Sequence, residues 1–183
     1  RHGRQFEVVT TRETFVVRTR DQFIGKHIWL TGEWEFDKFK QSLALLGRQR
    51  CRTLVDVGAN IGSICIPAVA RNLADRAIAI EPEPINFRLL TANVALNSVI
   101  DRVDCRQAAA GAIDGQTLTL ELASDNFGDH RISGSGSASR SRQTVPVRSE
   151  TLDSIVGVLD PTVDLLWLDV QGFRSEEHTS ELQ

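Results

Sequence analysis

From residue 53 onward, short apolar runs alternate with longer stretches in which apolar residues recur at helical spacing. A short apolar run is typical of a buried strand, and the helical spacing is typical of a helix with one buried face. Regular alternation of strand and helix favours a parallel sheet with right-handed crossovers. We therefore predict an α/β fold with a Rossmann-like sheet, whose first strands are 53–57, 77–81 and 103–109 and whose helices are 61–73 and 84–97.

The second half of the chain predicts a fourth strand of this sheet and several surface elements. Residues 163–170 (VDLLWLDV) are strongly apolar, as expected for a central parallel strand. Residues 116–122 alternate and predict a strand that pairs with 144–147, and 151–159 predict a short helix. The low-complexity segment 133–142 (SGSGSASRSR) predicts a surface loop.

The first fifty residues lack this alternation and predict a cap segment. Residues 6–10 and 14–19 are expected to form a hairpin, and 33–46 a helix with one apolar face. Trp29 and Trp34 are expected to be core or packing residues, because an indole ring buries a large apolar area. We place the cap at 1–50 and the sheet domain at 51–173.

Composition excludes several classes of protein. The chain has 183 residues, of which 41% are hydrophobic, so it can form a globular core rather than remain disordered. A net charge of −3 disfavours a dedicated nucleic-acid binder, and no apolar run approaches the length of a membrane span. The three cysteines form no metal-binding spacing, so we expect no metal site and a reducing, cytoplasmic location.

A glycine-containing turn after the first strand carries the clearest chemical signal. The strand leads through Asp56 into Gly58-Ala59-Asn60-Ile61-Gly62, where glycines let a ligand approach the backbone closely. Glu81 follows 19 residues after Gly62, at the end of the second strand. A carboxylate at that place can accept both hydroxyls of a ribose, so the pattern predicts a nucleoside-containing ligand.

The kind of nucleoside ligand depends on the glycine spacing. The dinucleotide fingerprint GxGxxG would need glycines at 58, 60 and 63, where this chain has Gly58, Asn60 and Ser63. S-adenosyl-L-methionine has no phosphate and does not need that cradle, so it is the favoured cofactor. A nucleotide-dependent oxidoreductase, a non-catalytic nucleoside-binding module and a merely structural turn stay open as alternatives.

Two further residues are candidates for catalysis. Asp169 ends the fourth predicted strand, where the strand order of a doubly wound sheet reverses and a ligand crevice opens. Its carboxylate could orient an acceptor hydroxyl, take its proton or face a sulfonium; the alternative is a loop or capping carboxylate. His130 has a side chain suited to deprotonating a hydroxyl, although a histidine in a polar loop is more often solvated.

Six motifs, in this order along the chain, resemble the FkbM family of methyltransferases. They are DVGANIG (56–62), EPEP (81–84), NxxLN (93–97), DNFGDHRI (125–132), TLD (151–153) and WLDVQGF (167–173). The resemblance implies a class I fold and S-adenosyl-L-methionine-dependent methylation, with a hydroxyl of a sugar, polyketide or other small molecule or glycan as acceptor.

The same resemblance implies roles for individual residues. Asp56, Gly58, Asn60 and Gly62 would surround the methionine part of the cofactor and Glu81 its ribose. Gln107 and Ala108 would lie beside the adenine, and Asp169 and the 126–130 loop would face the acceptor.

The ends of the sequence depart from the family pattern. The chain begins at Arg1 and contains no methionine, and it stops soon after the fourth strand of a sheet that has seven strands in class I enzymes. Residues 174–183 (RSEEHTSELQ) resemble a translated sequencing adapter. We therefore expect a fragment of the family domain with a non-native tail.

Overall fold

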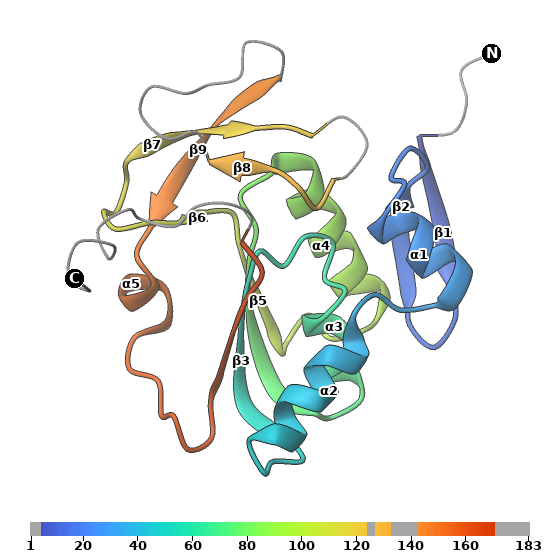
Figure 1. The fold of residues 1–183 in the computed structure, drawn as a ribbon, viewed down its shortest axis with the longest axis vertical. Coiled ribbons are helices and arrows are strands. Elements are labelled where there is room, and N and C mark those ends of the chain that lie inside the picture. The colour runs from blue at the N-terminus through green and yellow to red at the C-terminus, as the bar shows by residue number, and fades with distance from the viewer. Residues whose placement is uncertain (1–4, 124–126, 133–142, 171–183) are drawn as a thin grey trace, which may run out of the picture.

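The structure is a computed structural model that describes residues 5–123, 127–132 and 143–170 (Figure 1). The predicted loop at 133–142, Asn126 of the acceptor loop and the tail at 174–183 lie outside these residues. The described residues form a central parallel sheet with its helices, a second small sheet, and an N-terminal hairpin with one helix.

The central sheet has the predicted parallel arrangement. Its strands are β3 (Cys51–Val57), β4 (Ala74–Ile80), β5 (Val103–Arg106) and β10 (Leu165–Leu168), in the order β10-β3-β4-β5. Asp56 lies opposite Trp167 on one side and Ala79 on the other. The chain runs outward from β3 to β5 and returns to the other side of β3 with β10. The strand order therefore reverses beside β3, where a ligand crevice is expected.

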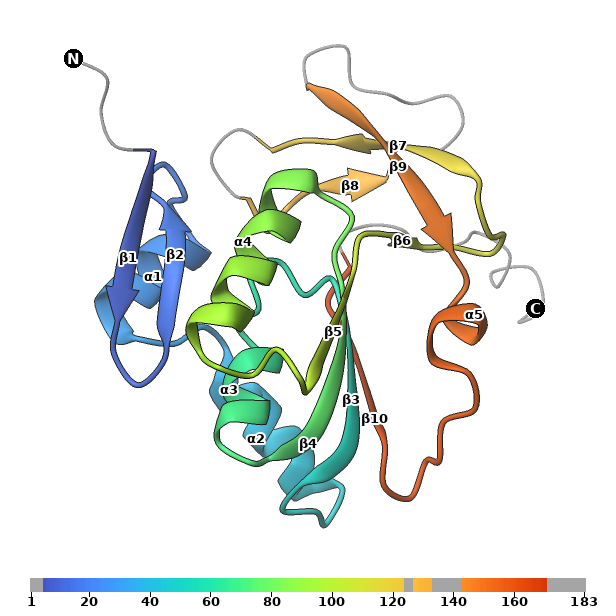
Figure 2. The same cartoon turned by 180° about the vertical axis from the view of Figure 1, so that it is seen from behind.

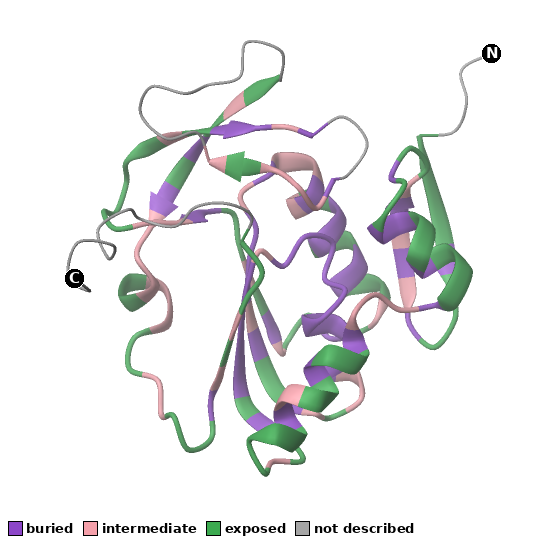
Figure 3. Cartoon of the chain, viewed as in Figure 1, coloured by how far each residue is buried: buried purple, intermediate pink, exposed green. Residues whose placement is uncertain are grey.

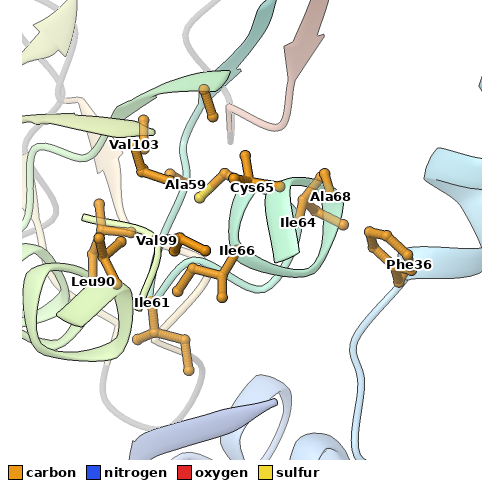
Figure 4. Packing of buried hydrophobic residues seen from close by; sticks show 14 of the residues in the cluster. Phe36, Ala59, Ile61, Ile64, Cys65, Ile66, Ala68, Leu90, Val99 and Val103 are labelled. Carbon is orange, nitrogen blue, oxygen red and sulfur yellow. The ribbon is translucent and has the colours of Figure 1, made fainter. Parts of the chain in front are cut away.

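Helices cover both faces of this sheet (Figures 1 and 2). One face packs against α2 (Phe36–Leu45), α3 (Cys65–Ala70) and α4 (Pro84–Leu96), and the other face packs against the short α5 (Leu152–Val156). Figure 3 shows the buried residues gathered between the sheet and the first group of helices, and Figure 4 shows α3 side chains between Leu90 of α4 and Phe36 of α2. The main core therefore lies on the α3–α4 face.

Two helix starts differ in how well the sequence predicted them. Helix α3 begins at Cys65 rather than at residue 61, because Asn60 and Gly62 have positive φ angles of 52° and 91° and cannot be helical. Pro67 falls in the first turn of this shorter helix, where its missing N–H costs no helical hydrogen bond. Helix α4 begins at Pro84 as predicted, and the Glu83 side chain caps it by accepting a hydrogen bond from the Asn86 N–H at 2.6 Å.

A second sheet lies at the carboxyl ends of the central strands (Figure 1). It contains β6 (Ala109–Ala110), β9 (Thr144–Glu150), β7 (Thr117–Glu121) and β8 (Arg131–Ile132), in that order. The predicted pairing of 116–122 with 144–147 is confirmed, because Leu118 lies opposite Val147 in an antiparallel ladder. The expected third strand at 103–109 is divided into β5 and the separate β6.

The N-terminal segment forms the predicted hairpin from β1 (Phe6–Thr10) and β2 (Thr14–Arg18), followed by an unpredicted helix, α1 (Ile24–Thr31). The predicted helix at 33–46 is α2, which begins three residues later. Trp34 packs against the core, but the prediction for Trp29 was wrong, because its side chain is 57% exposed on α1.

Two asparagines attach the hairpin to the sheet domain: the buried Asn93 of α4 and the half-buried Asn97, which caps the C-terminus of this helix. The Asn93 side chain accepts a hydrogen bond from the Val16 N–H at 2.6 Å and donates one to the Ile61 carbonyl at 2.9 Å. One helical turn later, the Asn97 amide pairs with both backbone groups of Thr14. These two side-chain amides satisfy backbone groups along one edge of β2. Specific hydrogen bonds therefore hold the hairpin to the sheet domain, in addition to packing.

Within the described ranges, no helix is both long enough and apolar enough to cross a bilayer. The same residues contain no group of three His, Cys, Asp or Glu side chains placed to hold a metal ion.

Candidate functional site

The turn after β3 is built from backbone groups that are already hydrogen-bonded. The N–H groups of Gly58 and Ala59 both donate to the Ile80 carbonyl, at 2.9 and 3.0 Å. The Asn60 N–H donates to Glu81 at 2.8 Å, the Ile61 N–H to the Asn60 side chain at 2.9 Å, and the Gly62 N–H to the Ala59 carbonyl at 2.8 Å. This turn therefore offers a ligand close approach but no row of free amides for a pyrophosphate.

Glycine is required at positions 58 and 62 of this turn for different structural reasons. Gly58 has a φ of 86°, and a Cβ there would overlap the backbone carbonyl of Asp169, which follows β10. Gly62 has a φ of 91°, and a Cβ there would crowd Ile66 of α3 and Leu90 of α4. Gly58 therefore permits contact between the turn and β10, whereas Gly62 permits close packing of two helices.

Glu81 is a buried carboxylate beside this turn. It is 5% exposed, and its two carboxylate oxygens accept hydrogen bonds from the N–H groups of Asn60 and Glu83, each at 2.8 Å. Burial raises the pKa of Glu81 to about 8, although these two backbone donors act in the opposite direction. Each oxygen keeps a second lone pair, so the carboxylate can still accept two hydroxyl groups from a ligand.

A cavity of about 200 Å³ opens beside Glu81, between the central and the second sheets. Its walls are mostly apolar, with a few polar side chains, as is usual for sites that bind small molecules. The residues lining it come from the ends of β3, β4 and β10, the start of α4, the chain after β5 and the second sheet: Val57, Gly58, Asn60, Ile80, Glu81, Pro82, Asn86, Ala108, Ala109, Ala110, Leu120, Phe127, Gly128, His130, Ile132, Leu168, Asp169 and Val170.

One wall of the cavity is the segment from Phe127 to His130. The side-chain amides of Asn60 and Asn86 both donate to the Phe127 carbonyl, at 2.8 and 2.9 Å. The guanidinium of Arg18, at the end of β2, lies over the Phe127 ring at 3.5 Å. The hairpin, the glycine turn and α4 therefore all hold this segment in place.

Asp169 follows β10, and its backbone carbonyl lies against Gly58 of the glycine turn. Its backbone N–H donates to the Val57 carbonyl at 2.9 Å, which fixes the residue at the end of β10. Its pKa is raised, first by partial desolvation and then by the nearby charge of Glu35. The raised pKa makes this carboxylate a stronger proton acceptor, and its exposed side chain leaves it accessible to a bound hydroxyl.

The structure brings six of the nine candidate site residues to this cavity: Gly58, Asn60, Glu81, Ala108, His130 and Asp169. Asp56, Gly62 and Gln107 are not among the residues that line it.

Asp56 lies next to cavity-lining residues in the sequence but does not itself line the cavity. It is 1% exposed and accepts a hydrogen bond from the Cys65 N–H at 3.2 Å, so it supports the start of α3. Burial raises its pKa to about 7. Side chains alternate along a strand, so Val57 reaches the cavity while Asp56 points to the helix face.

Asn86 and Phe127 line the cavity, but neither was individually predicted as a site residue. Phe127 lies inside the DNFGDHRI motif, which could have identified it. Asn86 is a polar residue in the first turn of α4 and is fully buried. Its only local signal is its place shortly after the EPEP motif.

Comparison with known proteins gave one family match. Residues 56–173 match a family model described as "Methyltransferase FkbM domain", which is more than half of the chain. No curated protein matches the sequence.

Solved structures with a similar fold include two TYW2 proteins. P. horikoshii TYW2 in complex with MeSAdo is 20% identical, with 61% of this chain and 39% of that chain covered and a TM-score of 0.43. M. jannaschii TYW2 in complex with AdoMet is 19% identical, with coverages of 63% and 49% and a TM-score of 0.44.

A third similar structure is an RNA methyltransferase from Salinibacter ruber in complex with S-adenosyl-L-homocysteine. It is 27% identical, with 40% of this chain and 47% of that chain covered and a TM-score of 0.35. The matched region is less than half the length of each of these three proteins.

Proposed function

This chain belongs to the FkbM methyltransferase domain family, and we propose that it uses S-adenosyl-L-methionine to methylate a hydroxyl group of a sugar, a polyketide or another small molecule or glycan. The observation that carries the choice of cofactor is the glycine turn, whose N–H groups from Gly58 to Gly62 are all engaged by protein acceptors. A dinucleotide needs such groups for its pyrophosphate, whereas S-adenosyl-L-methionine has no phosphate. The turn therefore disfavours an oxidoreductase.

The residues present fit this cofactor. Glu81 keeps a free lone pair on each oxygen for the two ribose hydroxyls, and Gly58 leaves the backbone open beside it. The apolar wall of Ile80, Pro82 and Ala108 suits a planar base. When bound, the cofactor would supply an electrophilic methyl group on a sulfonium.

In this proposal Asp169 acts on the methyl acceptor. It lines the same cavity as Glu81 but follows β10 rather than β4. Its carboxylate would orient the acceptor hydroxyl and take its proton as the oxygen becomes methylated, and solvent would then remove that proton. Holding acceptor and cofactor in line would supply most of the rate enhancement.

His130 is not proposed as the base. Its Nδ1 accepts a hydrogen bond from the Ala123 N–H at 3.0 Å, and burial lowers its pKa. The neutral ring then carries its proton on Nε2, the other nitrogen. A nitrogen that holds a proton can orient a ligand but cannot accept another proton.

Two measurements test the proposed function. Calorimetry should show binding of S-adenosyl-L-methionine and S-adenosyl-L-homocysteine, and no binding of NAD. Transfer of a radiolabelled methyl group should then be assayed with panels of sugars, polyketides and glycans, and with tRNA as a further acceptor. Tight NAD binding would refute the cofactor assignment. Methylation of tRNA alone would refute the proposed acceptor class and keep the cofactor.

A further inference from the structure

Two buried polar atoms beside the cavity lack a hydrogen-bond partner among the described residues. They are Oδ1 of Asn86 and Nε2 of His130, and both residues line the cavity. Asn86 is fully buried. A buried polar group without a partner is costly, so such atoms in a cavity indicate that a ligand supplies the missing partners.

The Asn86 side chain is held in one orientation. Its amide nitrogen donates to the Phe127 carbonyl at 2.9 Å, and its backbone N–H donates to the Glu83 carboxylate at 2.6 Å. The nitrogen must face the Phe127 oxygen because two oxygens would repel each other. Oδ1 is therefore the free end of the amide, and it can only accept a hydrogen bond.

The His130 ring presents a hydrogen-bond donor to the cavity, whereas Asn86 presents an acceptor. Its Nδ1 is occupied by the Ala123 N–H, so the neutral ring carries its hydrogen on Nε2. The adjacent Phe127 ring, 6.2 Å away between centroids, and the Arg18 guanidinium above it surround the histidine with an apolar ring and a positive charge. The cavity thus offers one hydrogen-bond acceptor and one hydrogen-bond donor, and no formal charge from these two side chains.

Short hydrogen bonds connect Asn86 to the carboxylate proposed to bind ribose. Glu81 accepts from the Glu83 N–H at 2.8 Å, and Glu83 in turn accepts from the Asn86 N–H. Because Glu81 and Asn86 line the same cavity, a base attached to a ribose held by Glu81 would be within reach of the start of α4. The apolar side chain of Ala108 lines the same cavity and would offer the base a packing surface.

We infer that Asn86 and His130 together recognise the hydrogen-bonding edge of the cofactor's adenine: the amino group donates to Asn86 Oδ1, and a ring nitrogen accepts from His130 Nε2. This inference rests on the proposed function, because it takes the nucleoside part of S-adenosyl-L-methionine as the ligand. It gives His130 a role in specificity in place of the catalytic role expected from the sequence.

The test compares two ligands and two substitutions by calorimetry on the 183-residue chain. S-adenosyl-L-homocysteine carries adenine, whereas S-inosyl-L-homocysteine has a carbonyl acceptor in place of the amino donor and a hydrogen on the neighbouring ring nitrogen. His130→Asn keeps an acceptor for the Ala123 N–H but removes the donor to the cavity, and Asn86→Ala removes the acceptor. His27→Asn on the exposed side of α1 is the matched control.

The expected effects follow from the loss of one neutral hydrogen bond. His130→Asn should weaken S-adenosyl-L-homocysteine binding by about 3- to 10-fold, and His27→Asn should leave it unchanged. The unsubstituted chain should prefer the adenosyl ligand to the inosyl ligand by about 10-fold, and Asn86→Ala should reduce that preference. The ratio of the affinities for the two ligands distinguishes a direct contact with the base from a disturbance of the Phe127 carbonyl. Such a disturbance would weaken the binding of both ligands equally.

Two results would overturn the inference. If the unsubstituted chain binds the adenosyl and inosyl ligands equally well, Asn86 and His130 do not recognise the base. The proposed function would still stand. If His130→Asn binds S-adenosyl-L-homocysteine with full affinity, His130 does not donate a hydrogen bond to the adenine. Absence of any binding to the unsubstituted chain would overturn both the inference and the proposed function.

Discussion

Replacing Glu81 by glutamine should change how the stability of the chain depends on pH. The carboxylate is buried, and burial raises its pKa to about 8 from an ordinary value of 4.5. The folded state therefore keeps a proton on Glu81 over a pH range in which the unfolded state has lost it. Glutamine has nearly the same shape and does not titrate, so Glu81→Gln isolates this single ionisation.

The sign and the size follow from the two pKa values. The stabilisation from protonated Glu81 is complete below about pH 4.5 and is lost as the pH rises through about 8. Between these limits the free energy of unfolding should fall by about 1.4 kcal/mol per pH unit because of this group, to a total on the order of 5 kcal/mol. Asp56 contributes with the same sign, but it is present in both proteins and cancels in their difference.

The assay is urea unfolding of both proteins at pH 5, 6, 7, 8 and 9. Glu81→Gln should be less stable than the unsubstituted chain at pH 5, because the glutamine NH₂ group faces one of the two backbone donors, Asn60 or Glu83. This difference should shrink and then reverse as the pH rises. Glu7→Gln, at an exposed position of β1, serves as the control and should follow the unsubstituted chain.

Parallel pH profiles for Glu81→Gln and the unsubstituted chain would refute this reasoning. They would mean that the two backbone hydrogen bonds offset burial and keep the carboxylate ionised in the folded state.

Four further predictions concern ligand binding, catalysis and folding. Affinity for S-adenosyl-L-homocysteine should increase by about 10-fold or more from pH 6 to pH 8, because ribose hydroxyls favour the ionised form of Glu81; calorimetry that shows no increase contradicts this. Glu81→Ala should weaken the same binding by roughly 10- to 100-fold through loss of a charged acceptor, and an unchanged dissociation constant would exclude the contact. Asp169→Asn should lower turnover by about 100-fold with little change in cofactor affinity; a matching loss of cofactor binding would place Asp169 in the cofactor pocket instead. Asn93→Ala should lower the free energy of unfolding by about 2–4 kcal/mol, because it leaves the Val16 N–H and Ile61 carbonyl without their partner, whereas Thr91→Ala on the exposed side of α4 should have little effect in the same urea titration.

The parallel sheet and the ends of its strands could be predicted because their signals are local. An apolar run followed by glycine or an acidic residue marks both the strand and its carboxyl end, as at Gly58, Glu81 and Asp169. Parallel strands place those ends at one edge of the sheet, so three residues far apart in sequence were correctly expected to share one cavity.

The buried face of α4 could not be predicted in this way. Apolar Leu96 at the end of α4 is 50% exposed, whereas the polar residues Asn86 and Asn93 are fully buried. A buried asparagine amide needs hydrogen-bond partners, and those of Asn86 and Asn93 include backbone groups of Phe127, Val16 and Ile61. No local pattern in the sequence reveals partners at such distances along the chain.

The position of β10 beside β3 has a consequence for the order of folding. Leu165–Leu168 pairs with residues 54–57, more than a hundred residues earlier, and Asp169 closes against Gly58 only after that pairing. Contacts of such long sequence separation form slowly, because a large loop must close first. During synthesis, β3, β4, β5 and their helices can assemble while the later chain is still being made, but the wall of the cavity that carries Asp169 cannot. We therefore expect ligand-binding capacity to appear after the core, with the docking of β10 as the step that completes the site.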